Sequence, residues 1–400
     1  MPNTILTPTA VTREALRILH QKSNFIGSIT REYDSSFAKD GAKIGDSLKI
    51  RLPNEYTVRT GATLAAQDTV ESSVTLQVAT QKGVDLNFTS TDLTLSLDDF
   101  SQRVLEPAMT RLSAAIEADA MSMYKDVYQS VWNGGSALTF NHVLDGRKLL
   151  QDALAPLNDR SANLNSLDQA NFIKDTKSLF QDSSTVAKQY REGYVGRTAG
   201  FDFMENTMWA AHTRGAANTG YTTNTTTGTL ALDGTAYSSI TVATGTGAMN
   251  VGDVFTIANV FKVHPESKVS TGIPQQFVVT AAYAGGGGSV SISPAIVLGG
   301  AKQNCVIPST SATAGLTFAG TASTAVGTSL LYQKEAFAFA TADLVMPKGV
   351  DFAAREVMDG ISIRVVRQYD INNDKFPCRL DVLYGYKTLR AQLAARLHNS

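Results

Sequence analysis

The chain has 400 residues, of which 43% are hydrophobic and only 18% are charged, and its 35 basic and 36 acidic side chains leave a net charge of -1. This length allows two or three domains with buried cores, and the near-neutral charge excludes a basic field that binds nucleic acid by counterion release. The charged fraction is below the ~25% usual for soluble domains, so we expect partners to cover much of the surface.

Residues 1–46 are predicted to form an arm. Thr12–Gln21 has the spacing of a short helix, and the apolar residues Phe25, Ile26 and Ile29 follow without a clear partner in the sequence. An apolar terminal arm frays unless it docks on something, and a neighbouring chain is the expected support.

Residues 47–81 are predicted to form an extended loop. Apolar and polar residues alternate in Leu48–Leu52 and again in Val74–Val78, which indicates two half-exposed strands separated by a long polar tip. A two-stranded hairpin alone is marginally stable in water, so we expect the tip to lie on an adjacent chain. The candidates for ion pairs in that contact are Arg59, Asp68 and Glu71.

Residues 82–135 combine a strand at Val84–Phe88 with the strongest helical pattern in the chain, from Asp98 to Val131. Acidic residues favour a helix start at Asp98, and Asn133-Gly134-Gly135 is a stop signal. The stripe expected to be buried consists of Leu105, Met109, Leu112, Ile116, Ala120, Met123 and Val127. The residues expected to face away from it, toward solvent, are Arg111, Glu117 and Lys125.

Residues 136–214 mix predicted helices, at His142–Ala155 and Gln169–Gln181, with short strands. At about residue 215 the composition shifts to Thr, Gly, Ala, Ser and Val with few charges. Many short strands between turn signals indicate a small sandwich or barrel, so we interpret 215–328 as an inserted β domain. The predicted strands include Ser239–Val242, Val254–Ile257, Gln276–Val279 and Ser289–Ser293.

Residues 329–400 return to a mixed composition. Ala336–Ala340 and Ile361–Val365 alternate as strands do, and Arg379–Tyr386 is predicted to be a final strand followed by a short tail, Thr388–Leu397. The whole chain is therefore predicted to be an α+β scaffold that is interrupted and then resumed.

No motif with catalytic or metal-binding spacing is present. The five histidines are scattered, and neither a G-x-S-x-G elbow nor a phosphate-binding loop occurs. Cys305 and Cys378 lie outside any C-x-x-C pattern, so neither a disulfide framework nor a zinc site is expected. The pattern of a signal peptide and apolar runs of ~18 residues are also missing. We therefore expect a cytoplasmically made protein with no catalysis, metal or cofactor.

Three stretches resemble the coat proteins of the short-tailed Salmonella phage P22 and its relatives. The first, Tyr190–Gly193 followed by Arg197 and Ala199–Asp202, is similar to the segment before that family's inserted domain. Val251–Ile257 looks like a strand of the inserted domain, and Cys378–Gly385 looks like the closing strand with its Tyr-Gly ending. From its residues alone the first stretch fits a structural turn or intersubunit segment better than an active-site loop, which is the alternative.

The order of elements also resembles that family over nearly the whole chain. The resemblance implies the tailed-phage coat protein fold named after phage HK97, with an N-terminal arm, extended loop, spine helix, peripheral and axial domains, and an inserted all-β domain. It implies a major capsid protein that self-assembles as pentamers and hexamers into an icosahedral shell around double-stranded DNA, which it contacts only weakly. A scaffolding protein and a portal are the implied assembly partners, the bacterial cytoplasm is the place of assembly, the virion capsid is the final location, and no membrane is involved.

Two other functions compete with this interpretation. A β-rich adhesion or carbohydrate-binding protein built around 215–328 needs a secretion signal and an exposed aromatic platform, and a hydrolase needs a polar constellation; neither is evident. A long helix, an exposed hairpin and an apolar arm make sense together when neighbours complete each of them, since obligate interfaces often bury more than ~2,000 Å². Size-exclusion chromatography with negative-stain microscopy distinguishes these functions, because a coat protein gives shells or large oligomers.

Overall fold

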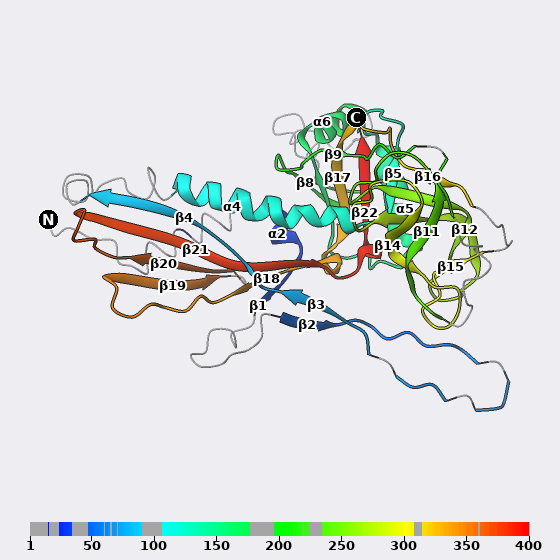
Figure 1. The fold of residues 1–400 in the computed structure, drawn as a ribbon, viewed down its shortest axis with the longest axis horizontal. Coiled ribbons are helices and arrows are strands. Elements are labelled where there is room, and N and C mark those ends of the chain that lie inside the picture. Colours follow the sequence, from blue (N-terminus) through cyan, green and yellow to red (C-terminus); the bar gives the residue numbers. More distant parts are fainter. Residues whose placement is uncertain are drawn as a thin grey trace. The chain divides into compact units, whose positions relative to one another are not determined.

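The computed structural model describes residues 15, 24–33, 47–59, 61–64, 66–69, 71–89, 106–176, 196–218, 220–223, 234–307, 314–358 and 361–399. It is an α+β structure made mostly of strands (Figure 1). The chain divides into two compact units, each built from separate segments. Unit 1 comprises Met1–Ile50, Ser73–Met121 and Phe337–Leu389, and unit 2 comprises Arg51–Ser72, Ser122–Ala336 and Arg390–Ser400. Most of the predicted arm, the predicted helix start at Asp98 and the Tyr190–Gly193 stretch lie outside the described residues.

The long predicted helix is α4, Glu106–Met121, in unit 1. Its predicted apolar stripe is buried from Met109 to Ala120, and Met123 and Val127 beyond the helix are buried as well, while Leu105 lies outside the described residues. The prediction of continuous helix to Val131 was wrong. The 3-10 helix η3, Ser122–Asp126, follows α4, and strand β5 begins at Ser130, so the apolar spacing continues although the α-helix ends.

The prediction that Glu117 faces solvent was also wrong, because the arm covers that side of α4. The Glu117 side chain is 1% exposed, and its Oε1 accepts a hydrogen bond of 2.6 Å from the backbone N of Phe25. Phe25 lies in the first turn of helix α2, Asn24–Ser28, where backbone N–H groups have no acceptor within the helix. Arg111 and Lys125 are exposed as predicted.

The main sheet of unit 1 has the order β1-β18-β21-β20-β19, and β4 also pairs with β21. Its strands are β1 Thr30–Tyr33, β4 Thr80–Thr89, β18 Phe337–Ala342, β19 Phe352–Met358, β20 Ile361–Arg367 and β21 Lys375–Thr388. The strands predicted after residue 329 are therefore present, and Ile361, Ile363 and Val365 are buried. Asp119 ties α4 to this sheet, because it pairs with Lys82 Nζ at 2.7 Å and accepts a hydrogen bond from Tyr384 Oη.

Strands β2, Ser47–Arg51, and β3, Ser73–Gln77, form a separate two-stranded sheet at the base of the extended loop. Leu76 and Val78 pack on alanines of β18, whose short side chains permit close approach. Gly385 in β21 lies against this same segment, and a Cβ added there would overlap the carbonyl oxygen of Gln77 and lie 2.8 Å from its carbonyl carbon.

A buried carboxylate organises the other end of the unit 1 sheet. Asp381 accepts hydrogen bonds from Arg364 Nη2 at 2.7 Å and from Arg379 Nε at 2.8 Å. Its cross-strand neighbour is Gly83, where an added Cβ would lie 2.5 Å from Asp381 Oδ1. Glycine at residue 83 therefore leaves the room in which the carboxylate lies. Burial alone would raise the pKa of Asp381, but hydrogen bonds from Arg364, Arg379 and Gln81 outweigh it and hold the pKa below its ordinary value.

Asp381→Asn is expected to destabilise the chain by roughly 1.5–3 kcal/mol at neutral pH, the range for hydrogen bonds to charged groups. Since the folded-state pKa is depressed, the stabilisation is complete above the unfolded-state pKa and is lost as pH falls below about 4. Urea unfolding of both proteins at several pH values tests this, and the difference in unfolding free energy should shrink in acid. The control Asp85→Asn changes an exposed carboxylate 3.9 Å from Arg379 and should have little effect. A difference that stays constant down to pH 2 contradicts the assignment.

In unit 2 one seven-stranded sheet has the order β5-β22-β17-β6-β8-β7, with β9 also paired to β17. Its strands are β5 Ser130–Trp132, β6 Arg160–Leu164, β7 Arg197–Thr198, β8 Phe201–Glu205, β9 His212–Thr213, β17 Ala325–Gln333 and β22 Ala394–Asn399. The tail predicted at Thr388–Leu397 is therefore wrong, because β22 lies between β5 and β17 and is buried. The predicted helices of this region are α5, Phe140–Asp152, and α6, Ser166–Thr176.

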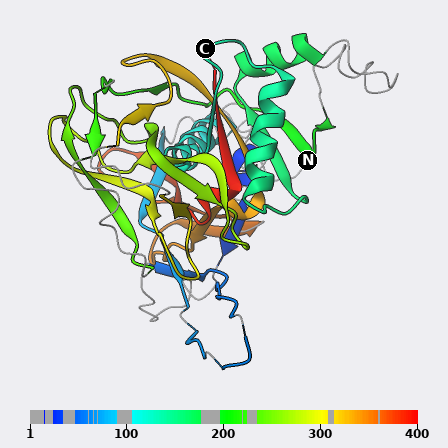
Figure 2. The ribbon, with the colours of Figure 1, turned by 90° about the vertical axis from the view of Figure 1, so that its right-hand side faces the viewer.

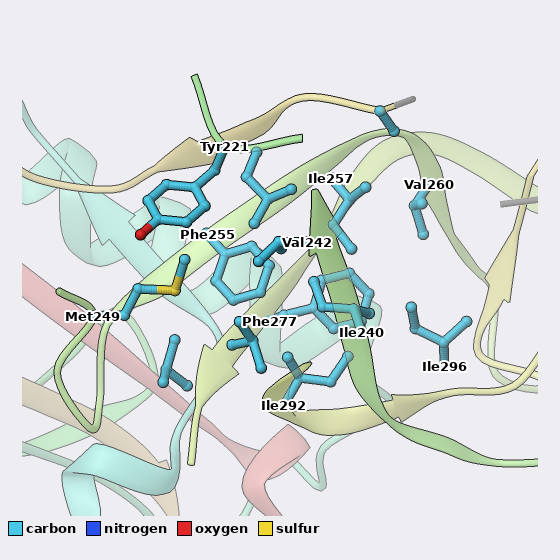
Figure 3. Close-up of a cluster of buried hydrophobic side chains, with 14 of the residues drawn as sticks. Tyr221, Ile240, Val242, Met249, Phe255, Ile257, Val260, Phe277, Ile292 and Ile296 are labelled. Carbon is cyan, nitrogen blue, oxygen red and sulfur yellow. The ribbon is translucent and has the colours of Figure 1, made fainter. Parts of the chain in front are cut away.

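The second sheet of unit 2 has the order β10-β11-β14-β13-β12-β15, with β16 also paired to β12. Its strands, which can be followed in green to yellow in Figure 2, are β10 Thr222–Thr223, β11 Tyr237–Thr244, β12 Val254–Val263, β13 Ser270–Val279, β14 Gly288–Ile296, β15 Cys305–Val306 and β16 Leu316–Phe318. They include the four strands predicted from their alternation. Their apolar side chains form one core, in which Phe255 and Phe277 lie among Val242, Ile257 and Ile292 (Figure 3).

Candidate assembly surface

The extended loop, Arg51–Ser72, lies between β2 and β3 and is drawn in blue in Figures 1 and 2. Nearly all of its described residues are exposed, and only Leu52, Asn54 and Ser72 are half-buried. A segment of this length that buries none of its described side chains gains no core of its own. It is the natural candidate for a surface that another molecule covers.

Hydrogen bonds across the loop hold its two sides together. Leu52 N donates to Ser72 O at 2.8 Å. Farther out, Thr57 N donates to Gln67 Oε1 at 2.9 Å, and Gln67 Nε2 donates to Thr57 O at 2.6 Å. The Gln67 amide thus replaces a backbone pair, and the loop is a narrow ribbon rather than an open coil.

The three charged residues expected in the contact are all exposed, but they are not brought together. Arg59 donates to the carbonyl of Gly61 in its own loop, whereas Glu71 pairs with Arg51 at 3.4 Å. In the described part of the loop, no ion pair joins Asp68 to Arg59. Exposed pairs such as Arg51–Glu71 contribute only ~0–1 kcal/mol, so the charges alone do not stabilise the ribbon.

The sequence interpretation missed the large apolar residues of the loop. Val58 is 96% exposed and Leu64 is 82% exposed, and Tyr56 is exposed as well. A signal existed, because bulky apolar residues stood in a polar stretch already expected to project from the chain. Their exposure makes them stronger candidates for contact residues than the charges, since burying each one gains ~1.5–3 kcal/mol.

The base of the loop is braced within unit 2. Lys268 Nζ lies 3.3 Å from Glu55 Oε2 and donates to Gln303 O at 3.3 Å. Lys268 belongs to the turn between β12 and β13, where its φ is 55°. The brace joins the loop to the second sheet of unit 2.

Nothing chemically reactive gathers in the described parts of the chain. No three His, Cys, Asp or Glu side chains there could hold a metal ion. Burial raises the pKa of Cys305 to about 12 and that of Cys378 to about 11, so both remain unreactive thiols at neutral pH. A cavity of about 230 Å³ between Leu149, Ile273 and Pro274 has a mostly apolar lining. In the same residues, none of the helices has the length and apolar character needed to cross a membrane.

A family model described as "P22 coat protein - gene protein 5" matches residues 28–395. A solved structure described as Mycobacterium phage Che8 is 12% identical, with a TM-score of 0.48 over 94% of this chain and 90% of that chain. The capsid of the cyanophage P-SCSP1u is 9% identical, with a TM-score of 0.45 over 89% and 84% of the two chains. The mature capsid of bacteriophage PhiM1 is 10% identical, with a TM-score of 0.45 over 94% and 87%. None of the curated proteins matches the sequence.

Proposed function

This chain belongs to the P22 coat protein family, and from that premise we propose that its extended loop, Arg51–Ser72, binds an adjacent subunit. As a phage coat protein it is the structural, shell-forming protein of the capsid and not an enzyme. The observation that carries the proposal is the exposure of Val58 and Leu64 on a ribbon whose two sides are tied together. A shell in which each loop lies on a neighbour buries these side chains in every subunit.

The loop is stiff enough to act as a docking element. The Thr57–Gln67 hydrogen bonds and the Lys268–Glu55 brace restrict it before contact. Binding by a restricted segment loses less conformational entropy than binding by a coil. Arg59, Asp68 and Glu71 are proposed to form ion pairs with the neighbouring subunit around this apolar contact, and they contribute specificity more than affinity.

A double variant, Val58→Asp with Leu64→Asp, is expected to leave a folded subunit that does not form shells. Both side chains are exposed in the subunit, so their replacement leaves its core intact, but two carboxylates would be buried in the contact. Sedimentation and negative-stain microscopy measure assembly, and circular dichroism measures folding. The matched control is Thr63→Asp, which places the same charge at an exposed polar residue of the loop. Shells of normal yield from the double variant would remove the loop from the interface.

The proposed subunit architecture is the HK97 type, with α4 as the spine helix. Residues 215–328 are proposed to be an inserted β domain that stabilises the subunit and contacts neighbours across local symmetry axes. Strands β10 to β16 pair within their own sheet, and their core cluster runs from Ala217 to Leu316, which supports independent folding.

Residues 215–328 expressed alone are expected to give a β-type spectrum and one cooperative melting transition. The reason is that their apolar core is internal to the segment. The same melt followed by tyrosine fluorescence should coincide with the circular dichroism transition, as for a two-state domain. A disordered fragment would show that this segment depends on the rest of the chain.

The complete particle is proposed to be an icosahedral shell of pentamers and hexamers, assembled in the bacterial cytoplasm with a scaffolding protein and a portal. Double-stranded DNA is its proposed content. The net charge of -1 supports weak, non-specific contact with that DNA. Particles purified from infected cells, analysed by mass spectrometry and by nuclease protection of their DNA, test these partners.

A further inference from the structure

One face of the first sheet of unit 2 buries cationic side chains. Arg396 and His398 are two residues apart on β22 and therefore project from the same side of the strand. Arg396 is 0% exposed and His398 is 5% exposed. Among the described residues, Nε, Nη1 and Nη2 of Arg396 and Nε2 of His398 have no hydrogen-bond partner, which is costly for buried polar groups.

Side chains from three other segments face this pair. The Arg396 guanidinium carbon lies 5.9 Å from the ring centre of Tyr124 in η3. The Tyr124 ring lies 5.9 Å from the ring of His212 in β9, and that ring lies 5.8 Å from the ring of His398. His212 Nε2 is 3.0 Å from Asp253 Oδ1, in the turn before β12. The cluster thus connects β22, η3 and β9 to the second sheet.

The buried charges of this cluster leave no acceptor for an additional proton. Asp253 accepts hydrogen bonds from Gly215 N at 2.9 Å and from Asn250 N at 2.8 Å, besides its contact with His212. This carboxylate also faces two buried guanidinium groups, those of Arg396 and Arg214. Asp126 and Lys125 at the end of η3 are exposed, so solvent screens their charges.

We propose that His398 is an acid-sensitive latch, whose protonation places a second cation beside Arg396 and separates the end of β22 from its neighbours. The proton comes from solvent. His398 pairs with Thr328 of β17 and with Trp132 of β5, close to the last pair of the strand, Gly327 with Asn399. Opening therefore needs only the last residues of β22 to move.

The direction of the pH dependence follows from the environment of His398. Burial, then the charge of Arg396, then His212 hold the pKa of His398 well below its ordinary value. A histidine released from the cluster binds a proton below about pH 6.5, whereas the buried one does not. The open form therefore gains about tenfold in population for each pH unit below 6.5, until the buried ring itself titrates. Above pH 6.5 the latch stays closed.

Hydrogen exchange of the full-length chain between pH 7.5 and 5 tests the latch. After correction for the intrinsic pH dependence of exchange, the amides of Leu397 and His398 should lose about tenfold in protection per pH unit below 6.5. Amides of β13, such as Phe277, should not change. In His398→Leu the protection of the β22 amides should stay constant with pH. The control His264→Gln changes a histidine in the turn after β12 and should behave like the wild type.

If His398→Leu does not fold, carbon-13 labelling of the five histidines in the wild-type chain provides the second measurement. The ring of His398 should stay neutral to well below pH 6.5 and change only as the β22 amides begin to exchange. A ring that titrates near pH 6.5 while these amides stay protected would overturn the proposal. Loss of protection in His398→Leu at the same pH as in the wild type would also overturn it.

Discussion

Gly385→Ala is expected to destabilise unit 1 by ~3 kcal/mol or more, at the upper end of the range for overpacked cores. The added methyl group would overlap the carbonyl oxygen of Gln77 and contact the backbone of Val78. A backbone cannot rotate out of the way as a side-chain end can, so β3 or β21 has to shift. Both strands carry buried residues, such as Leu76 and Tyr384, and the shift would disturb their packing as well.

Soluble yield and the urea midpoint of unfolding measure this effect. The matched control is Gly27→Ala, because no atom lies within 4 Å of a Cβ added at Gly27 in helix α2. Alanine there is expected to be neutral or to stabilise the helix by ~0.5–1 kcal/mol. Equal midpoints for Gly385→Ala and the wild type would show that β3 does not press on β21 in solution.

Ile116→Asp is expected to prevent folding and to yield inclusion bodies. Ile116 is fully buried on the apolar stripe of α4, and the loss of a buried isoleucine side chain alone costs roughly 2–5 kcal/mol. The aspartate adds the cost of burying a carboxyl group. The sum approaches the whole stability of a typical domain, ~5–15 kcal/mol.

Two substitutions on exposed residues control for handling of the helix and of the segment that follows it. Arg111→Ala in α4 and Lys125→Ala in η3 should each change the unfolding free energy by about 0.5 kcal/mol or less. Purified soluble Ile116→Asp that assembles into normal particles would mean that α4 buries a different face.

Local sequence patterns predicted most of the elements but not their partners. The apolar spacing from Met109 to Val127 reported burial correctly, because each side chain's direction depends on nearby backbone. The same spacing misplaced the helix end, since Met123 and Val127 stay buried although η3 and an irregular segment replace the α-helix. Periodicity records which residues are buried more reliably than it records which hydrogen bonds the backbone makes.

Long-range contacts account for the errors. Glu117 looked like a surface residue because its partner, Phe25 N, belongs to an arm whose docking leaves no local signal. Ala394–Asn399 looked like a tail because Arg396 and His398 are polar, yet the strand is internal to its sheet. In the loop, charged residues drew attention while Val58 and Leu64 did not, although free energies of burial favour the apolar pair. The domain boundaries and the contacts of Arg59, Asp68 and Glu71 stay predictions.

The position of β22 also sets an order of events during translation. Ser130 of β5 pairs with Arg396 of β22, so nearly the whole chain is synthesised before β5 gains this partner. Strands β10 to β16 find theirs within residues 222–318 and can pair much earlier. Meanwhile β17 keeps one edge open, and open edges recruit strands from other chains. A chaperone that protects nascent coat protein therefore has a defined window of action, which opens when Gln333 leaves the ribosome and closes when β22 does.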